Sequence, residues 1–251
     1  MNIKWYGVGG KLDGKPEDEK RDFQLKKFFS KHLDKTDVFV FQEIIDVDRL
    51  INLFPAFNCQ SYNKRNPRHQ HIVVCVKKTL RAKFEVLYSM DLDNAGLRPA
   101  VMAEINLGDD QIVRVYGVHL KAREDESDVR IDQIKAFAQN TNFDEPAVVI
   151  GDFNTYTTLR NGKSFDDDQM IEEILDDYEF DQVGDGVDSY VGRFTFRKFD
   201  RAWTRKLEVT PLSVFGPCKK DFPLPFGHKG FYRNKISDHC PISLTIKNIL
   251  D

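Results

Sequence analysis

The side chains best suited to chemistry in this sequence follow a short apolar run, Ala147 to Ile150. Such a run is typical of a strand that is buried on both faces. Gly151 would then let the backbone turn, so that Asp152 and Asn154 emerge together at the edge of a sheet. A carboxylate there could orient a water molecule, and an amide could stabilise a developing oxyanion. Taken alone, the segment is more typical of a strand that ends in an ordinary Asp/Asn turn.

Four further segments place polar side chains beside an apolar strand, namely 38–43, 117–121, 199–203 and 237–241. In the first, Glu43 follows a strand-like run, and its carboxylate at the rim of the sheet would suit a hard cation such as Mg²⁺. In the second, His119 ends the strand-like run 112–118. Each side chain has an ordinary alternative, a solvated glutamate in one case and a packed histidine in the other.

The other two segments pair an acid with a base. Asp200 and Arg201 are neighbours in an aromatic strand, where they could equally form a surface salt bridge. Asp238 directly precedes His239, so it could fix the orientation of the imidazole or raise its pKa.

Together and in this order, the five segments resemble the endonuclease/exonuclease/phosphatase superfamily, also called DNase I-like. The resemblance is carried by Gln42-Glu43, His119-Leu120, Gly151-Asp152-Phe153-Asn154, Asp200-Arg201 and Ser237-Asp238-His239. It implies an α/β fold with a single domain over residues 1–251, a four-layer sandwich of two packed, mixed β-sheets flanked by helices. It also implies hydrolysis of phosphoester bonds with a divalent cation, Mg²⁺ or Mn²⁺, with Ca²⁺ as a further candidate.

The resemblance assigns the central roles to three residues. Glu43 would bind the metal, Asp152 would orient or activate the attacking water, and Asn154 would hold the phosphate or stabilise the transition state. The family also has an Asn at the end of its first strand, where this sequence reads Ile3 to Tyr6 and then Gly7. We therefore expect Gly7 to replace that Asn, which leaves a catalytically weakened binding module as an alternative function.

The resemblance also gives the two histidines acidic partners. His239 would be a general base or an electrostatic stabiliser, supported by Asp238. His119 would contact the phosphate or act as a general acid, oriented by Asp200.

Four basic residues are candidates for substrate binding. Arg98 resembles the phosphate-contacting Arg of the DNase I branch, and Arg201 follows the acid of its segment. Lys64 and Arg65 belong to a basic loop that could touch a backbone phosphate, although a surface Arg and a solvated loop are equally ordinary. The sequence thus predicts a nuclease that hydrolyses DNA, or alternatively RNA. A lipid or inositol phosphate phosphodiesterase or phosphatase is the second candidate.

Composition adds limits to these predictions. With a net charge of −3 in 251 residues, the chain has no global attraction to nucleic acid, so a local basic patch or a bound cation must supply it. No apolar run approaches a membrane span, and we expect a monomer. The location would be cytoplasmic, or secreted or periplasmic after removal of a signal peptide. Cys75 and Cys240 lie in strand-like runs and are expected as buried thiols, although four cysteines permit disulfides.

Periodicity predicts the main elements. Helices are expected at 19–33, after an N-cap at Asp46, around 131–138 and around 170–175. Strands are expected at 38–41, 72–76, 83–88, 100–105, 112–118, 147–150 and 242–246. Because several strands follow one another with few helices between them, two mixed sheets fit better than one parallel sheet.

Overall fold

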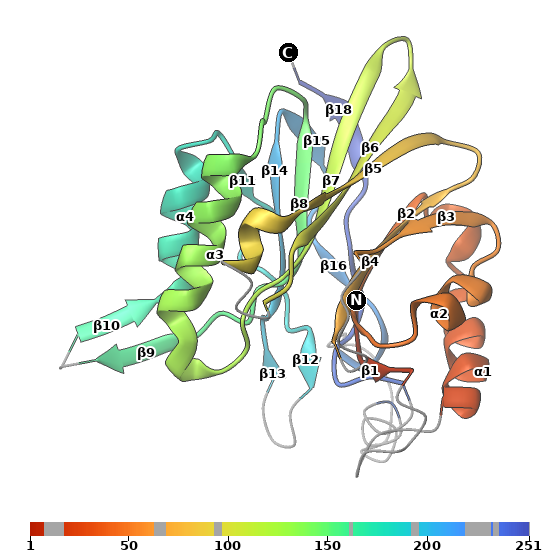
Figure 1. The fold of residues 1–251 in the computed structure, drawn as a ribbon, viewed down its shortest axis with the longest axis horizontal. Coiled ribbons are helices and arrows are strands. Elements are labelled where there is room, and N and C mark those ends of the chain that lie inside the picture. Colours follow the sequence, from red (N-terminus) through yellow and green to blue (C-terminus); the bar gives the residue numbers. More distant parts are fainter. Residues whose placement is uncertain are drawn as a thin grey trace.

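Two β-sheets pack face to face and carry helices on their outer surfaces (Figure 1). The computed structural model describes residues 1–7, 18–62, 69–92, 97–160, 163–191, 196–218, 232 and 236–250. Helices α1 (Asp18–Phe29) and α2 (Val47–Leu53) lie on one side, and α3 (Ser127–Asn140) and α4 (Asp167–Asp176) on the other. The predicted four-layer α/β sandwich is confirmed.

The first sheet has the strand order β1-β2-β4-β3, with β1 parallel to β2 and the other pairs antiparallel. Its strands are β1 (Asn2–Tyr6), β2 (Val38–Ile44), β3 (Phe57–Gln60) and β4 (His71–Lys77). The second sheet has the order β11-β14-β8-β7-β6-β5, in which only β7 and β8 run parallel. Its strands are β5 (Arg81–Leu87), β6 (Ala100–Gly108), β7 (Gln111–His119), β8 (Ala147–Asp152), β11 (Asp181–Gln182) and β14 (Asp200–Arg205).

The remaining elements are short. They are the strands β9 (Thr157–Arg160), β10 (Lys163–Asp166), β12 (Tyr190–Val191), β13 (Phe196–Arg197), β15 (Leu207–Val209), β16 (Ser213–Val214), β17 (Ile242–Ser243) and β18 (Ile246–Ile249), and the 3₁₀ turns η1 (Leu33–Lys35), η2 (Tyr88–Asp91), η3 (Glu124–Glu126) and η4 (Gly216–Cys218). The strand expected at 242–246 is therefore two strands, because β17 pairs with β16 and β18 pairs with β15.

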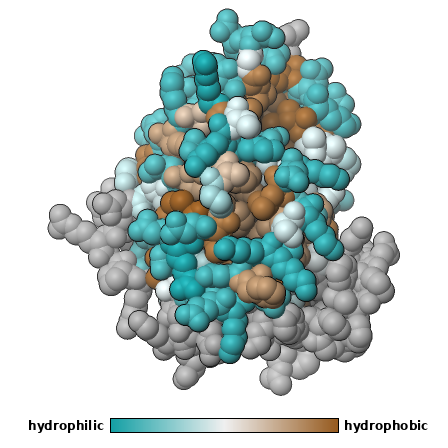
Figure 2. All heavy atoms as spheres, turned by 90° about the vertical axis from the view of Figure 1, so that its right-hand side faces the viewer, coloured by the Kyte–Doolittle hydropathy of each residue, from teal (hydrophilic) through white to brown (hydrophobic). Residues whose placement is uncertain are grey.

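Hydrophobic side chains fill the three spaces between the four layers. Phe29 and Phe41 pack between the first sheet and its helices, and Val74 and Val115 pack between the sheets. Trp203 is fully buried in the cluster that joins the second sheet to α3 and α4. On the outer face that carries α1 and α2, hydrophilic and hydrophobic residues are interspersed (Figure 2). Within the described part of the chain, no helix combines the length and hydrophobicity that a bilayer span requires.

The N-cap expected at Asp46 is confirmed, since its carboxylate accepts the backbone N–H of Arg49 at 2.9 Å and α2 begins at the next residue. The first helix is shorter than expected, because α1 ends at Phe29 and Leu33 begins the separate turn η1.

The expectation of buried thiols at Cys75 and Cys240 is wrong, because both form disulfides. Cys59 and Cys75 are direct partners in the antiparallel pair β3–β4, and their sulfurs are bonded. Cys218 is bonded to Cys240, 22 residues further along the chain. Both pairings depend on tertiary neighbours, which cysteine spacing alone does not reveal.

Candidate active site

Three neighbouring strands of the second sheet bring three of the candidate residues into one row. The register of β7 and β8 places His119 opposite Asp152, and the register of β8 and β14 places Asp200 on the other side of Asp152. Side chains of register partners lie on the same face of a sheet. His119 Nε2 is 3.5 Å from Asp152 Oδ2, and all three residues are buried. The sequence predicted these residues, and the strand order makes them neighbours.

Gly151 permits the close approach that holds this row together. A Cβ atom at Gly151 would lie 2.0 Å from the carbonyl oxygen of Val118 on β7, so no larger residue fits. The expected turn comes later than Gly151, because β8 continues through Asp152 and the left-handed residue is Asn154, with φ of 49°. Asp152 Oδ1 accepts the Asn154 backbone N–H at 3.0 Å, and Asn154 Nδ2 donates to the Leu120 carbonyl at 3.3 Å.

The first sheet contributes Asn2 and Glu43. Asn2 Nδ2 lies 3.0 Å from Glu43 Oε1 and 3.0 Å from Asp152 Oδ2, so one amide joins the two sheets. The other carboxylate oxygen of Glu43 accepts the Trp5 backbone N–H at 3.1 Å. The expected replacement of the family's Asn by Gly7 is therefore wrong, because Asn2 supplies the amide. Asn2 is the only asparagine before Asn52, which is the signal that could have found it.

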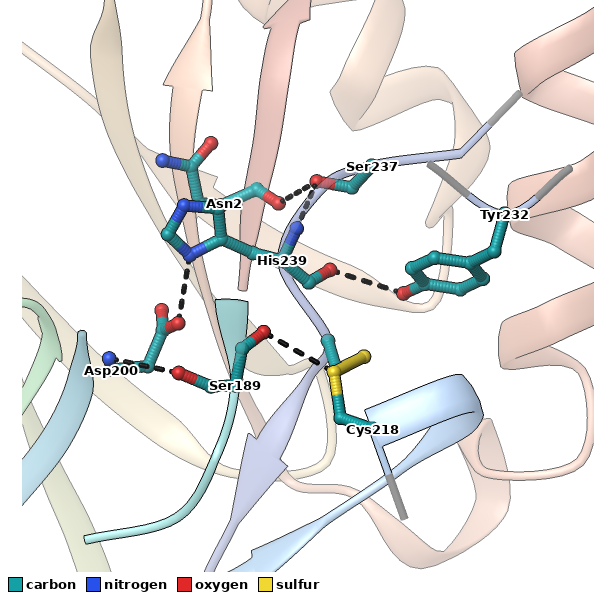
Figure 3. The surroundings of a disulfide bond; sticks show 8 residues. Asn2, Ser189, Asp200, Cys218, Tyr232, Ser237 and His239 are labelled. Atoms are coloured by element: carbon teal, nitrogen blue, oxygen red, sulfur yellow. Dashed lines mark hydrogen bonds and ion pairs between the residues drawn. A yellow bond between two sulfur atoms is a disulfide. The ribbon is translucent and has the colours of Figure 1, made fainter. Parts of the chain in front are cut away.

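His239 completes the cluster from a segment outside the sheets. Its Nδ1 lies 2.8 Å from Asp200 Oδ2, and its Nε2 lies 3.7 Å from Asp152 Oδ2. The backbone of His239 is held on both sides, as Figure 3 shows. Its N–H donates to Ser237 Oγ at 3.0 Å, and its carbonyl accepts the hydroxyl of Tyr232 at 3.1 Å. Tyr232 is thus a buried support of the His239 backbone.

The prediction that Asp200 orients His119 is wrong. Asp200 orients His239 and not His119, because strand β8 separates Asp200 from His119 in the row. Asp238 supports His239 through its charge, which helps to raise the pKa of the imidazole. Its carboxylate forms an ion pair with Lys4 Nζ at 3.0 Å on the rim of the site, so Asp200 is the residue that fixes the ring.

The substrate-binding role expected for Arg201 is also wrong. Arg201 follows Asp200 on β14, so it points to the opposite face of the sheet. There its guanidinium forms an ion pair with Asp168 from α4 and donates to the Asp185 carbonyl at 3.3 Å. Arg201 therefore connects β14 to neighbouring segments away from the row.

Burial and charge give the central groups different protonation states. Burial raises the pKa of Asp152 to about 7, although the positive charge of His239 opposes this rise. Burial alone would lower the pKa of His239, but the charges of Asp200 and Asp152 raise it to about 10. Burial, Arg98 and His239 together hold the pKa of His119 well below its ordinary 6.5. At neutral pH the site therefore holds a charged His239, a neutral His119 and a carboxyl group near its titration midpoint.

Arg98 lies beside Asn154 at the edge of this cluster. Arg98 Nη1 donates to the Leu120 carbonyl at 3.3 Å, and the same oxygen accepts the amide of Asn154 at 3.3 Å. The other end of the guanidinium bonds to Gln70 Oε1. Arg98 is only partly buried, so it presents positive charge next to the Asn154 amide. Lys64 and Arg65 lie outside the described residues.

Comparison with known proteins identifies the architecture. No protein-family model matches the sequence, and no curated protein matches it. TDP2 from D. rerio, solved with a single-strand DNA product, is 16% identical and matches 98% of each chain with a TM-score of 0.67. An endonuclease/exonuclease/phosphatase family protein from Bacteroides thetaiotaomicron is 10% identical, with a TM-score of 0.65 over 100% of this chain and 96% of that one. The chain has the endonuclease/exonuclease/phosphatase fold.

A sugar phosphatase shares the fold as well. The mannosyl-6-phosphatase of Bacteroides thetaiotaomicron is 11% identical and matches 98% of this chain and 97% of its own, with a TM-score of 0.65. At such low identities the likeness concerns the fold alone. Proteins with the endonuclease/exonuclease/phosphatase fold thus act on different substrates, so the substrate must be inferred from the residues of the site.

Within this fold, Glu43 is the residue that fits a divalent cation. Its carboxylate is only partly buried, and it lies one amide away from Asp152. Among the described residues no group of three His, Cys, Asp or Glu side chains could enclose a metal ion. Mg²⁺ is commonly held by one or two carboxylates, and water and substrate oxygens complete its shell, whereas Ca²⁺ takes six to eight oxygen ligands.

Proposed function

We propose that this protein is a phosphoesterase that depends on a divalent cation and hydrolyses phosphodiester bonds of nucleic acid, DNA first and RNA second. The observation that carries the proposal is the position of Asp152. This buried carboxyl group, with a pKa of about 7, lies between two histidines and is bridged to Glu43 by Asn2. A general base works best when its pKa is close to the operating pH.

The residues around Asp152 divide the work of hydrolysis. A cation held by Glu43 would polarise a phosphoryl oxygen as a Lewis acid. Asp152 would accept a proton from the water whose oxygen attacks phosphorus as the bond to the leaving group breaks. His239, charged through its bond to Asp200, would stabilise the negative charge that develops on the phosphate. Neutral His119 can donate one ring N–H to a phosphate oxygen.

The amide of Asn154 and the guanidinium of Arg98 form the anion-binding side of the site. They meet at the Leu120 carbonyl, so a phosphate that contacts one is within reach of the other. Arg98 offers a planar pair of donors that matches two phosphate oxygens. The net charge of −3 makes such a local cation necessary for a polyanionic substrate. The DNA-bound TDP2 structure, which has the same fold, further supports nucleic acid as the substrate class.

The proposal is tested by cleavage of bis-p-nitrophenyl phosphate with Mg²⁺ or Mn²⁺, with EDTA as the control. Cleavage that EDTA abolishes would support a metal-dependent phosphoesterase, whereas binding of oligonucleotides without any cleavage would favour the binding module. A panel of plasmid, single-stranded DNA, RNA, inositol phosphates, sphingomyelin and mannose 6-phosphate then separates the substrate classes. Preference for a small phosphate ester over every polynucleotide would contradict the nucleic-acid proposal.

The two disulfides bear on the location of the protein. Structural disulfides persist mainly in oxidising compartments. We therefore propose a secreted or periplasmic location in preference to the cytoplasm. Alkylation of free thiols in intact cells, followed by mass spectrometry, tests this location, because unmodified cysteines at all four positions are expected and full alkylation would refute it.

A further inference from the structure

The Cys218–Cys240 disulfide lies directly beside the catalytic cluster (Figure 3). Cys240 follows His239 in the sequence, and Cys218 ends the turn η4. Both cysteines are buried, Cys240 at 0% and Cys218 at 5% exposure. The covalent bond therefore anchors the segment that carries His239 to a part of the chain outside both large sheets.

Ser189 connects this disulfide to the acidic partner of His239. Its carbonyl oxygen accepts the backbone N–H of Cys240 at 2.7 Å and lies 3.4 Å from Cys218 Sγ. Its hydroxyl oxygen accepts the backbone N–H of Asp200 at 3.0 Å. Since Asp200 Oδ2 lies 2.8 Å from His239 Nδ1, these contacts form a closed circuit through Ser189, Asp200, His239 and Cys240.

Because the residues of this circuit are buried, the loss of any one of its hydrogen bonds is costly. Ser189 and Asp200 are at most 1% exposed, so water cannot readily replace a broken hydrogen bond. Two thiol sulfur atoms in van der Waals contact lie farther apart than two bonded ones. When the disulfide opens, the two sulfur atoms must move apart, and Ser189, whose carbonyl oxygen contacts both cysteines, is the neighbour that connects this change to Asp200.

We propose that the Cys218–Cys240 disulfide, acting through Ser189, positions Asp200 and His239 for turnover, and that a dithiol reductant lowers activity by opening it. In the reduction the S–S bond breaks, Cys218 and Cys240 each take one hydrogen, and the reductant is oxidised to its own disulfide. This regulation rests on the proposed phosphoesterase function. Ser189 and the two cysteines are positioning residues, because none of them reaches the reacting atoms.

The second disulfide supplies a matched control. Cys59 and Cys75 join β3 to β4, where four consecutive register pairs already hold the two strands together. Opening this bond removes a cross-link of the first sheet and leaves the circuit around Ser189 intact. A general loss of stability would affect both disulfide variants, whereas a positioning effect would affect only one.

The first test compares the Cys218→Ser/Cys240→Ser protein with the Cys59→Ser/Cys75→Ser protein on bis-p-nitrophenyl phosphate. We expect kcat to fall by about tenfold to a hundredfold in the former with little change in KM, because small displacements of catalytic groups cost about this much. Wild-type protein treated with dithiothreitol should lose activity to the same extent and recover it after reoxidation. Equal losses in both double variants, or unchanged kcat in the first, would overturn the proposal.

The second test uses Ser189→Ala, which retains both disulfides and keeps the proposal testable even where the double variant does not fold. We expect a fall in kcat of about tenfold and a lower pKa of the His239 imidazole, followed by NMR. In the intact protein the Asp200 carboxylate helps to raise that pKa to about 10, and a loosened contact should move it toward 6.5. An unchanged His239 titration in both Ser189→Ala and the reduced protein would refute the positioning role.

The NMR measurement also separates this proposal from the proposed function, because it requires no turnover. A wild-type protein that cleaves no phosphoester, yet shows the shift of His239 on reduction, would refute the phosphoesterase function and retain the coupling. An active enzyme whose His239 does not respond to reduction would do the reverse.

Discussion

Replacement of Asp152 by Asn should severely lower turnover and at the same time change how stability depends on pH. Burial raises the pKa of Asp152 from 3.8 to about 7 in the folded protein. Between these values the unfolded chain has released the proton that the folded chain still binds, so the free energy of unfolding falls as pH rises. Above about pH 7 the folded protein carries the full free-energy cost of holding the ionised Asp152 carboxylate in a buried site. At ~1.4 kcal/mol per pKa unit, this cost is about 4 kcal/mol as an upper value.

Asparagine does not ionise, so the variant avoids the cost of a buried charge, but it loses one hydrogen-bond acceptor, which costs less. Both oxygens of Asp152 accept hydrogen bonds, one from the Asn154 backbone and one from the Asn2 amide. Asparagine keeps one acceptor and turns an N–H₂ group toward a donor, which costs about 1–3 kcal/mol in a buried site. Relative to wild type, the variant should therefore be less stable at pH 4 and about 1–3 kcal/mol more stable at pH 8.

The assay is urea unfolding followed by circular dichroism at both pH values, in EDTA so that a bound cation does not affect the carboxylate. Asp132→Asn, on the exposed side of α3, serves as the control and should alter neither stability nor turnover. Turnover of Asp152→Asn with Mg²⁺ should fall by roughly two to four orders of magnitude. A stability difference that is equal at pH 4 and pH 8 would refute the raised pKa. Near wild-type turnover in the folded variant would refute the role as a base.

The other predictions concern the metal, the protons and the anion-binding residues. Glu43→Gln should lower the rate and regain part of it at higher Mg²⁺ or Mn²⁺, and an equal reduction at every metal concentration would contradict a ligand role. The wild-type rate should rise through about pH 7, as Asp152 ionises, and fall near pH 10, as His239 loses its proton. His239→Ala should lack the fall at alkaline pH. A pH profile identical to that of wild type would exclude His239 from the reaction. Arg98→Ala should slow cleavage of polynucleotides and of a small diester alike. Neutralising Lys64 and Arg65 should weaken only polynucleotide binding. The slope of log affinity against log salt concentration should then decrease by about one unit for each phosphate that is no longer neutralised. Equal reductions on both substrates after the loop change would favour a small phosphoester.

The sequence is informative wherever the chemistry is local to one strand. Asp152, His119 and Glu43 each end a strand-like apolar run, and all three reach one site. Alternation along a strand also predicts that Asp200 and Arg201 lie on opposite faces of the sheet, since neighbouring side chains on a strand point to opposite sides. Grouping Arg201 with the phosphate-binding residues neglects that rule, and its ion pair with Asp168 shows the consequence.

The features that the sequence does not reveal depend on register and on contacts between distant segments. Asn2 is the only asparagine before Asn52, but the family resemblance places the Asn at the end of the first strand and not at its start. In the structure β1 pairs with β2 so that Asn2 lies opposite Gln42, which brings the amide beside Glu43. Such a register is set by the packing of two strands separated by a helix, and no spacing within the first ten residues encodes it.

The two histidines show why residue type alone could not assign the acid and the base. Both are buried, and both approach the same oxygen of Asp152, at 3.5 Å and 3.7 Å. Their pKa values nevertheless move in opposite directions. At His239 the charges of Asp200 and Asp152 outweigh the effect of burial, whereas burial and the positive charges of Arg98 and His239 lower the pKa of His119. The strand order β7-β8-β14 contributes to this difference, since it places Asp152 between His119 and Asp200 and so leaves the Asp200 carboxylate to His239. In a sheet with Asp200 next to His119, this carboxylate would raise the pKa of His119 instead of that of His239.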